Sequence, residues 1–402
     1  MSDTPSREPW LTIVGLGEDG LDGLSAASRD ALEAAEVVMG ARRHLSLIGE
    51  MRAETVEWPV PFADGLLILL GFRGRPTVAL VSGDPFWFGA GAVIARSLDA
   101  GEWRAMPGPS TFSLAAARMG WPLENVDCVG LHAAPLSRLK PQLARGARAV
   151  ALLRDGDTVN ALAKYLVAEG FEASRLTVLE ALGGPREQIT AMPADPPPET
   201  TFSHPVAVAI EVDGDGPAIA RASGIEDGFF ETDGQITKRP LRALALSALA
   251  PKLHETLWDI GGGSGSIAVE WLLAHPSTDA VSIEVRPDRA VRIRKNAAHL
   301  GVDRLKVIEG EAPAALDGLD APDAIFIGGG LSDELLNDLI ERAPGARLVA
   351  HAVTLETESL LTAWSARLGG DLTRIELSEA APLGSKRGWK ASYPITQWRA
   401  TL

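Results

Sequence analysis

The sequence has a single cysteine, Cys128, and seven histidines among 402 residues. One thiol cannot form an internal disulfide, so a disulfide-stabilised framework is excluded. The apolar neighbours Val129 and Leu131 indicate that Cys128 fills a core rather than acting as a nucleophile. The histidines form no H-x-x-x-H pair and no Cys/His cluster, and we therefore expect no metal site.

Long apolar runs and an excess of basic residues are also missing. The longest apolar runs, such as residues 66–70, are too short to cross a bilayer, and residues 1–9 lack the basic start and apolar core of a signal peptide. The formal net charge of −15 argues against nucleic acid or an anionic membrane as the main partner. We therefore expect a cytoplasmic protein that binds neither.

The length fits two domains of about 200 residues each. Short apolar runs at residues 11–14, 78–81 and 149–153 alternate with helical stretches such as residues 26–35. This alternation predicts α/β layers with largely parallel sheets. The breaker at residues 213–217 predicts one domain over 1–212 and a second over 213–402, with a linker over 213–237.

The second half contains a strand, a glycine loop and a helix in succession. Residues 256–260 form the expected strand, and Gly261, Gly263, Ser264 and Gly265 lie in the loop that follows. Glycines let the backbone turn sharply and approach a ligand closely. Glu284 ends the next predicted strand, where a carboxylate can accept the two ribose hydroxyls of a nucleoside.

Three features favour S-adenosylmethionine (SAM) over NAD as that nucleoside. Asp259, two residues before the first glycine, suits the amino-acid end or the sulfonium of SAM but would repel a pyrophosphate. A third strand leads into Glu311 and Ala312, which we expect at the adenine edge. A fourth ends in the glycines 328–330, which would let a substrate approach the methyl group. The alternative is a glycine loop that only packs a helix on a strand.

The second half resembles a known family. Residues 236–242, 258–266, 326–330 and 352–357 together resemble the decarboxylating methyltransferases of corrin biosynthesis, over nearly all of residues 225–402. The resemblance implies a Rossmann-like class I SAM-dependent methyltransferase fold for the C-terminal domain.

The first half carries G-x-G-x-x-G at residues 15–20, but its second strand ends without a carboxylate for a ribose, so we reject NAD there. Residues 78–85, 106–113 and 178–187 instead resemble three ordered motifs of the tetrapyrrole methylase superfamily, whose SAM lies between two α/β lobes. The resemblance implies a two-lobed tetrapyrrole methylase fold over the N-terminal domain. It also implies SAM contacts from six residues: Gly83, Asp84, Ser110, Thr111, Ala181 and Leu182. For Asp84, an Asx-turn before Pro85 is an alternative that can coexist with ligand contact.

The fusion of these two halves resembles the bifunctional corrin methyltransferases. It implies one SAM per domain and precorrin-6B as the tetrapyrrole substrate, with precorrin-8 as the product. It further implies C5 methylation by the first domain, and C15 methylation with decarboxylation of the C12 acetate by the second. By analogy with relatives of each half we expect a homo-oligomer.

A substrate with many carboxylates needs basic contacts. We hypothesise that two groups supply them: Lys238, Arg239 and Arg242 before the glycine loop, and Lys386 and Arg387 near the C-terminus. Solvated surface charge is the alternative. His351 and Glu356 are catalytic candidates for the proton handling of decarboxylation, with a purely structural histidine as the alternative for His351.

Four other functions compete with this interpretation. They are a SAM-dependent methyltransferase of another tetrapyrrole, an NAD-dependent enzyme using the second glycine loop, an RNA or DNA methyltransferase, and a regulatory SAM-binding protein without catalysis. Asp259 and the glycines 328–330 oppose the NAD-dependent enzyme. The negative charge opposes the nucleic-acid enzyme.

Overall fold

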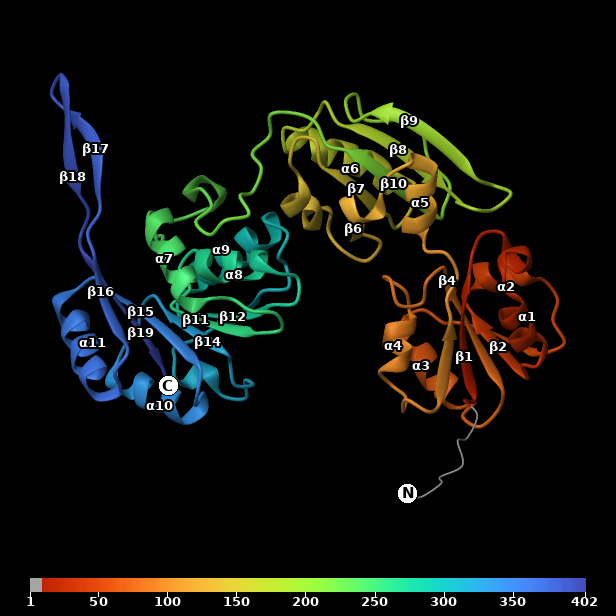
Figure 1. The fold of residues 1–402 in the computed structure, drawn as a ribbon, viewed down its shortest axis with the longest axis horizontal. Helices are drawn as coiled ribbons and strands as arrows, with labels where there is room; N and C mark the ends of the chain where they lie inside the picture. The colour runs from red at the N-terminus through yellow and green to blue at the C-terminus, as the bar shows by residue number, and fades with distance from the viewer. Residues whose placement is uncertain (1–8) are drawn as a thin grey trace. The chain divides into compact units, whose positions relative to one another are not determined.

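The computed structural model describes residues 9–402, which form two compact units (Figure 1). Unit 1 comprises residues up to 134 and 142–217, and unit 2 comprises 135–141 and 218–402. The chain passes finally from one to the other at Pro217–Ala218, inside the predicted linker. Residues 135–141 lie with unit 2, where Arg138 pairs with Asp303 at 2.7 Å. The sequence had not indicated that residues 135–141 belong to unit 2.

The first sheet of unit 1 is fully parallel, with strand order β3-β2-β4-β1-β5. Helices α1 and α2 cover one face and α3 and α4 the other, because alternate side chains of the buried strands point to opposite faces. The strands are β1 (Leu11–Leu16), β2 (Val37–Gly40), β3 (Glu54–Glu57), β4 (Thr77–Ser82) and β5 (Trp103–Met106). The helices are α1 (Ala26–Glu33), α2 (Arg42–Ile48), α3 (Phe62–Leu70) and α4 (Gly91–Ala95).

The second sheet of unit 1 is mostly antiparallel, with order β6-β7-β10-β8-β9. Only β6 and β7 run parallel, so the prediction of largely parallel sheets fails here. The reason is that β8 and β9 are joined directly without a crossover helix, and β10 returns between β7 and β8. The elements are α5 (Thr111–Met119), β6 (Asp127–Gly130), β7 (Arg148–Leu152), α6 (Asp157–Ala168), β8 (Arg175–Glu180), β9 (Gln188–Pro193) and β10 (Val206–Glu211).

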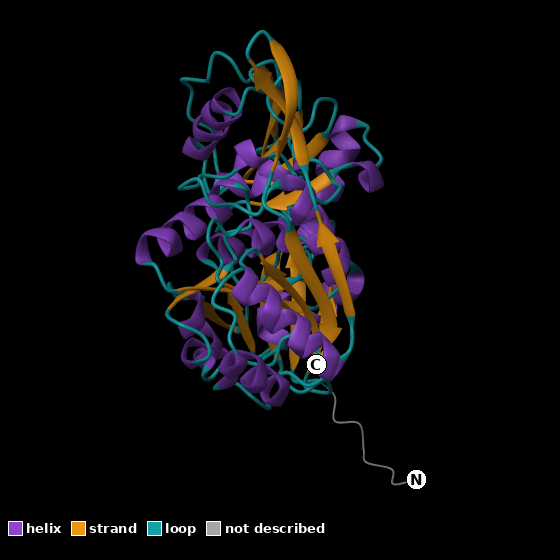
Figure 2. Ribbon diagram, turned by 90° about the vertical axis from the view of Figure 1, so that its left-hand side faces the viewer, coloured by secondary structure: helices purple, strands orange, loops and turns teal. Residues whose placement is uncertain are grey.

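Unit 2 is built on a seven-stranded sheet of order β13-β12-β11-β14-β15-β19-β16. The first five strands are parallel, and β19 runs antiparallel to both β15 and β16. Helices α7, α8 and α9 pack on one face, and α10 and α11 on the other. Figure 2 distinguishes the helices, strands and loops of the molecule by colour. The strands are β11 (Thr256–Ile260), β12 (Asp279–Glu284), β13 (Lys306–Glu309), β14 (Ala324–Ile327), β15 (Arg347–Ala352), β16 (Asp371–Ile375) and β19 (Ile395–Thr401). The helices are α7 (Arg239–Leu249), α8 (Ser266–Ala274), α9 (Pro287–His299), α10 (Asp333–Arg342) and α11 (Leu355–Leu368).

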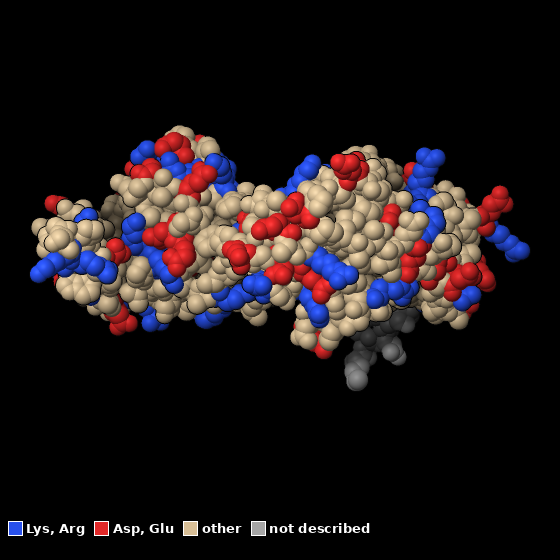
Figure 3. Space-filling model, turned by 90° about the horizontal axis from the view of Figure 1, so that it is seen from above, with Lys and Arg blue, Asp and Glu red and all other residues tan. Residues whose placement is uncertain are grey.

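A separate two-stranded hairpin, β17 (Ser378–Leu383) and β18 (Lys386–Ala391), projects from the body of unit 2 (Figure 1). Short 3-10 helices complete the fold: η1 (Gly20–Gly23), η2 (Leu123–Asn125), η3 (Leu136–Gln142), η4 (Asp227–Phe229) and η5 (Ala314–Leu316). Acidic and basic side chains are interspersed over the face seen in Figure 3, without a continuous basic area. Across residues 9–402, no helix combines the length and the apolarity that a bilayer crossing requires.

Candidate cofactor sites

The glycine loop of unit 2 follows β11, at the carboxyl edge of the parallel strands. Gly261, Gly263 and Gly265 have φ values of +73°, +61° and +76°, a backbone region that strongly favours glycine. A Cβ at Gly261 would lie 2.8 Å from the backbone nitrogen of Gly329, because the loops after β11 and β14 touch there. The two glycine runs identified in the sequence therefore form one surface.

Glu284 lies beside this loop, at the end of β12. One carboxylate oxygen accepts a hydrogen bond from the backbone nitrogen of Gly263 at 2.8 Å, and the other accepts from that of Arg286 at 2.9 Å. These bonds fix the carboxylate before any ligand arrives, which lowers the entropic cost of binding. Glu284 is itself buried, with 3 % of its surface exposed, and its contact with ribose hydroxyls stays a prediction.

Asp259 lies one strand away but beneath the loop, with 1 % of its surface exposed. Burial raises the pKa of its carboxyl to about 7 and the Glu284 charge adds to the rise, while hydrogen bonds from Ser282 and the Ala268 backbone oppose it. The predicted direct contact of Asp259 with SAM is therefore corrected. Its side chain has almost no free surface, so it supports the loop from below.

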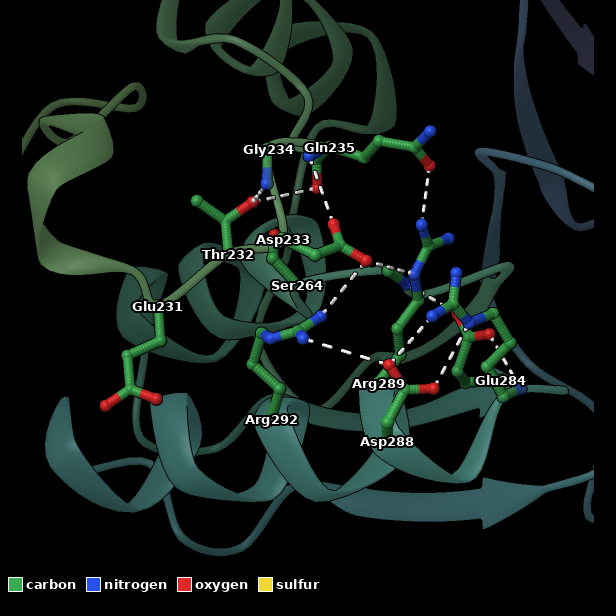
Figure 4. Close-up of polar contacts among 12 residues, drawn as sticks. Glu231, Thr232, Asp233, Gly234, Gln235, Ser264, Glu284, Asp288, Arg289 and Arg292 are labelled. Carbon is green, nitrogen blue, oxygen red and sulfur yellow. Dashed lines mark hydrogen bonds and ion pairs between the residues drawn. The ribbon is translucent and has the colours of Figure 1, made fainter.

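A strap over residues 231–235 lies against the glycine loop and α9, and sequence reasoning missed it. Asn296 joins the two, because its amide nitrogen donates to the carbonyl of Ser264 at 2.8 Å and to that of Glu231 at 2.9 Å. Arg289 donates to Asp233 at 2.8 Å (Figure 4). This pair and a backbone hydrogen bond from Gln235 lower the pKa of Asp233 to about 2. The polar composition of residues 231–235 was the only available signal.

Gly329 has an ordinary φ, and a Cβ placed on it would meet open space. The folded chain therefore gives no reason for a glycine at this position, which is consistent with close approach by a ligand. Glu311 is exposed and Ala312 is partly buried in the loop after β13, a position open to an adenine. Ser264 is buried, and its carbonyl is occupied by Asn296.

His351 is buried near the carboxyl end of β15. Its ring contacts that of Phe326 edge-on, with the two ring centroids 5.1 Å apart. Its Nε2 lies 2.9 Å from the side-chain oxygen of Gln397, and since that oxygen can only accept, Nε2 carries the proton. Burial lowers the pKa of His351, which keeps the imidazole neutral at neutral pH. Glu356 is exposed in the first turn of α11, where a carboxylate also favours the helix dipole.

Three loops of unit 1 meet at the carboxyl edge of its parallel sheet. A Cβ at Gly15 would lie 1.8 Å from the carbonyl oxygen of Gly83 and 2.6 Å from the nitrogen of Gly108. Gly83 itself has φ +52° and accepts a hydrogen bond from Gly108 at 3.1 Å. The first glycine of the G-x-G at residues 15–17 therefore serves loop packing.

A cavity of about 420 Å³ opens beside these loops. Asp84, Ser110 and Thr111 line it, so three of the predicted contacts come together. Asp84 accepts a hydrogen bond from the nitrogen of Phe86 at 2.8 Å, which is the Asx-turn alternative, and still faces the cavity. Ser110 caps α5 by accepting from the nitrogen of Ser113 at 3.0 Å. The lining is strongly aromatic, and the sequence did not indicate this: Trp58, Phe62, Trp87, Phe88 and Phe112.

Ala181 and Leu182 are both buried and do not line this cavity. The nitrogen of Ala181 already donates to the carbonyl of Pro205 at 2.9 Å, and its carbonyl accepts from Gly184 at 3.2 Å. The backbone contacts of Ala181 and Leu182 with adenine therefore stay a prediction.

Comparison with known proteins agrees with this division. Residues 10–196 match the family of tetrapyrrole (corrin/porphyrin) methylases, and residues 228–402 match the precorrin methyltransferase domain. A precorrin-6Y C(5,15)-methyltransferase [decarboxylating] of Sinorhizobium sp. is 48% identical, with 100% of both chains covered. The chain belongs to this family.

Two further relatives match part of the chain. A cobalt-precorrin-6B C(15)-methyltransferase (decarboxylating) of Salmonella typhimurium is 33% identical over 168 residues, covering 40% of this chain and 85% of its own. A crystal structure of the C-terminal domain of precorrin-6Y C5,15-methyltransferase from Rhodobacter capsulatus is 52% identical, covering 46% of this chain and 100% of its own, with a TM-score of 0.45. Membership confirms the expected corrin methyltransferase and its α/β fold, and the methyl donor of such methyltransferases is SAM.

The basic residues expected to bind the carboxylates of a precorrin have other positions. Arg242 is fully buried and pairs with Glu270 and Asp227, so its predicted substrate contact is corrected. Lys238 lies 3.8 Å from Asp227, and Arg239 pairs with Glu226, although both side chains are exposed. Lys386 and Arg387 lie at the outer end of the β17–β18 hairpin, and not on the sheet edge that carries the glycine loops.

Proposed function

We propose that the chain methylates precorrin-6B at C5 and C15 and removes the C12 acetate carboxyl as carbon dioxide, giving precorrin-8. In this proposal unit 1 performs the C5 methylation, and unit 2 performs the C15 methylation and the decarboxylation. The name of the Salmonella relative supports this division. It contains C15 methylation and decarboxylation without C5, and its alignment is short enough to fit one unit.

The observation that carries the proposal is that each unit has its own glycine-lined loops at the carboxyl edge of its own parallel sheet. That edge is where open α/β sheets bind their ligands. We therefore propose one SAM for each unit. In unit 2, Glu284 would accept hydrogen bonds from the ribose hydroxyls. Gly263 and Gly265 would let the ligand lie close to the backbone, and Gly329 would leave room for the substrate carbon. In unit 1, Asp84, Ser110 and Thr111 would hold the cofactor in the aromatic cavity.

These residues have a limited chemical task, because the sulfonium already activates the methyl group. The protein aligns the acceptor carbon with the methyl carbon and the sulfur, and excludes water from the reacting atoms. For decarboxylation the protonated macrocycle can take up the electron pair of the broken C–CO2 bond. One protein group must then take part in the proton transfer. The neutral imidazole of His351 is our candidate for that group, and Glu356 is a weaker one because it is exposed.

The test uses the full chain and two substitutions, Asp84→Ala in unit 1 and Glu284→Gln in unit 2. Calorimetry should find two SAM sites in the unchanged chain and one in each variant. Mass spectrometry of the product should find that Asp84→Ala loses the C5 methyl group and that Glu284→Gln loses the C15 methyl group. One SAM site in the unchanged chain, or loss of both methyl groups in either variant, would contradict the division.

We also propose that copies of the chain associate through the β17–β18 hairpin. An isolated two-stranded hairpin is at best marginally stable in water. This one exposes 80 % of Trp389, and Tyr393 just beyond it is 84 % exposed. Light scattering should find an oligomer for the unchanged chain and a smaller species for Trp389→Glu. An unchanged mass for the variant would contradict the proposal.

A further inference from the structure

Unit 1 contains a polar cluster formed by Arg43 and His44 of α2 and Ser82 at the end of β4. None of these three residues is among the proposed cofactor contacts. Ser82 Oγ accepts a hydrogen bond from Arg43 Nη2 at 2.8 Å and lies 3.0 Å from His44 Nε2. Arg43 Nη2 also lies 2.9 Å from His44 Nε2. Ser82 is exposed, and both it and His44 line the cavity that Asp84 and Thr111 line.

The positions of the protons follow from these contacts. A guanidinium only donates, so the Nε2 atom beside it presents a lone pair and the ring proton lies on Nδ1. Because Ser82 Oγ accepts from Arg43, its own proton can be donated to His44 Nε2. Burial and then the Arg43 charge lower the pKa of His44 to about 4, and the nearby Leu80 backbone opposes this shift. The imidazole is therefore neutral and able to accept a proton at neutral pH.

The surrounding charges moderate the effect of Arg43. The buried carboxylate of Glu18 pairs with Arg43 on one side and with Arg186 at 2.7 Å on the other. It therefore offsets part of the positive charge that opposes protonation of His44. Asp84, the other ionisable group of the cavity lining, is already bound to the Phe86 nitrogen and is assigned above to the cofactor.

Methylation at C5, which rests on the proposed function of unit 1, must release a proton. The bridging carbon carries one hydrogen, and its π electron pair forms the new bond to the methyl carbon while the pair of the broken S–CH3 bond stays on sulfur. The carbon is then tetrahedral and the macrocycle carries the positive charge. Conjugation returns when the C–H bond breaks, its electron pair re-forms the π bond, and a base takes the proton.

We propose that Ser82 Oγ takes this proton while its own proton passes to His44 Nε2. Ser82 is then a catalytic residue, and His44, which acts through it, is a positioning residue and the acceptor at the end of the relay. Arg43 holds both side chains in place. The imidazolium formed next to Arg43 is short-lived and returns its proton to solvent, which resets the pair.

The test uses the full chain, SAM with a labelled methyl group, and precorrin-6B carrying either hydrogen or deuterium at C5. We expect Ser82→Ala and His44→Gln to slow C5 methylation about 100-fold or more, the usual scale of general-base catalysis. We expect deuterium to slow both variants further, because C–H cleavage then limits the rate. SAM binding and C15 methylation should not change. Ser46→Ala is the matched control, since its exposed hydroxyl lies on α2 and outside the cavity lining.

An undiminished C5 rate in Ser82→Ala, or a slow rate that ignores deuterium, would overturn the relay. Because Ser82 is exposed, this variant remains informative even if His44→Gln fails to fold. Failure of the proposed function gives a different result. C5 methylation would then continue in Asp84→Ala, whereas failure of the relay alone leaves C5 methylation dependent on Asp84 and independent of Ser82.

Discussion

The guanidinium of Arg242 on α7 is buried against the carboxylate of Glu270 on α8, with neither side chain open to solvent. Glu270 also accepts hydrogen bonds from the nitrogens of Gly224 and Ile225, at 2.6 and 3.1 Å. Arg242 in turn donates to the carbonyl of Ile225. The pair therefore fastens the segment that enters unit 2 to α7 and α8, two of the helices that cover its sheet.

Substitution of Arg242 by leucine should destabilise unit 2 by about 3–5 kcal/mol, because it leaves the Glu270 charge buried without a cation. Scanning calorimetry should find one of the two unfolding transitions at a lower temperature and the other unchanged. Arg239→Ala is the control and should cost less than about 1 kcal/mol, since its ion pair is exposed. Equal effects of the two substitutions would refute this account.

The stability of unit 2 should fall as the pH rises from about 4 to 7, in part because of Asp259. Its native pKa is raised to about 7 from an ordinary 3.8, so between these values the native state holds a proton that the unfolded state has lost. The stabilisation is complete below the unfolded pKa and is lost as pH rises through the folded pKa. Asp259→Asn should remove up to about 4 kcal/mol of the decline in the free energy of unfolding between these pH values. Urea titrations at several pH values measure this difference. Parallel curves for the two proteins would contradict the assignment.

Gly329→Ala should preserve folding and lower the kcat/KM of C15 methylation about 10- to 100-fold, since the added methyl group enters space that we reserve for substrate. Gly228→Ala is the matched control, because its Cβ also meets open space at an ordinary φ but lies away from the glycine loops. Single-turnover assays and melting temperatures measure the two effects separately. A fully active Gly329→Ala would mean that no ligand passes there.

His351→Asn should reduce carbon dioxide release about 100-fold while SAM binding to unit 2 persists, if the neutral imidazole manages the proton of decarboxylation. Release of labelled carbon dioxide from substrate labelled in the C12 acetate carboxyl measures this step directly. Glu356→Gln serves as the comparison and should have a smaller effect, because that side chain is exposed. Normal release from His351→Asn would leave the histidine a structural role beside Gln397 and Phe326.

Replacing Lys386 and Arg387 together by alanine should leave the KM for the tetrapyrrole unchanged. Both lie at the end of a hairpin that projects from the body of unit 2, and neither lines the glycine loops. Steady-state kinetics with the double variant decides the matter. A clear rise in KM would restore the carboxylate-binding role expected from the sequence.

The sequence alone was sufficient for the elements whose signal is local. The strand, glycine loop and helix of residues 256–274 were readable because positive φ values demand glycine and because buried parallel strands are short apolar runs. The acid at the end of the next strand followed from the same register, since β12 pairs with β11 residue by residue. The SAM-type site of the second half could therefore be predicted from local signals, whereas that of the first half rested on the resemblance of three motifs to tetrapyrrole methylases.

The tertiary structure decided which side chains of a helix or strand are buried and which are open to a ligand. It buried Arg242 and Asp259, which the sequence placed at the substrate and the cofactor, because burial is a property of the neighbouring helices and strands. It also brought Ser82 to His44, from elements 38 residues apart, and laid the strap of residues 231–235 on α9. Such contacts arise from packing between distant segments, and local composition carries no record of them.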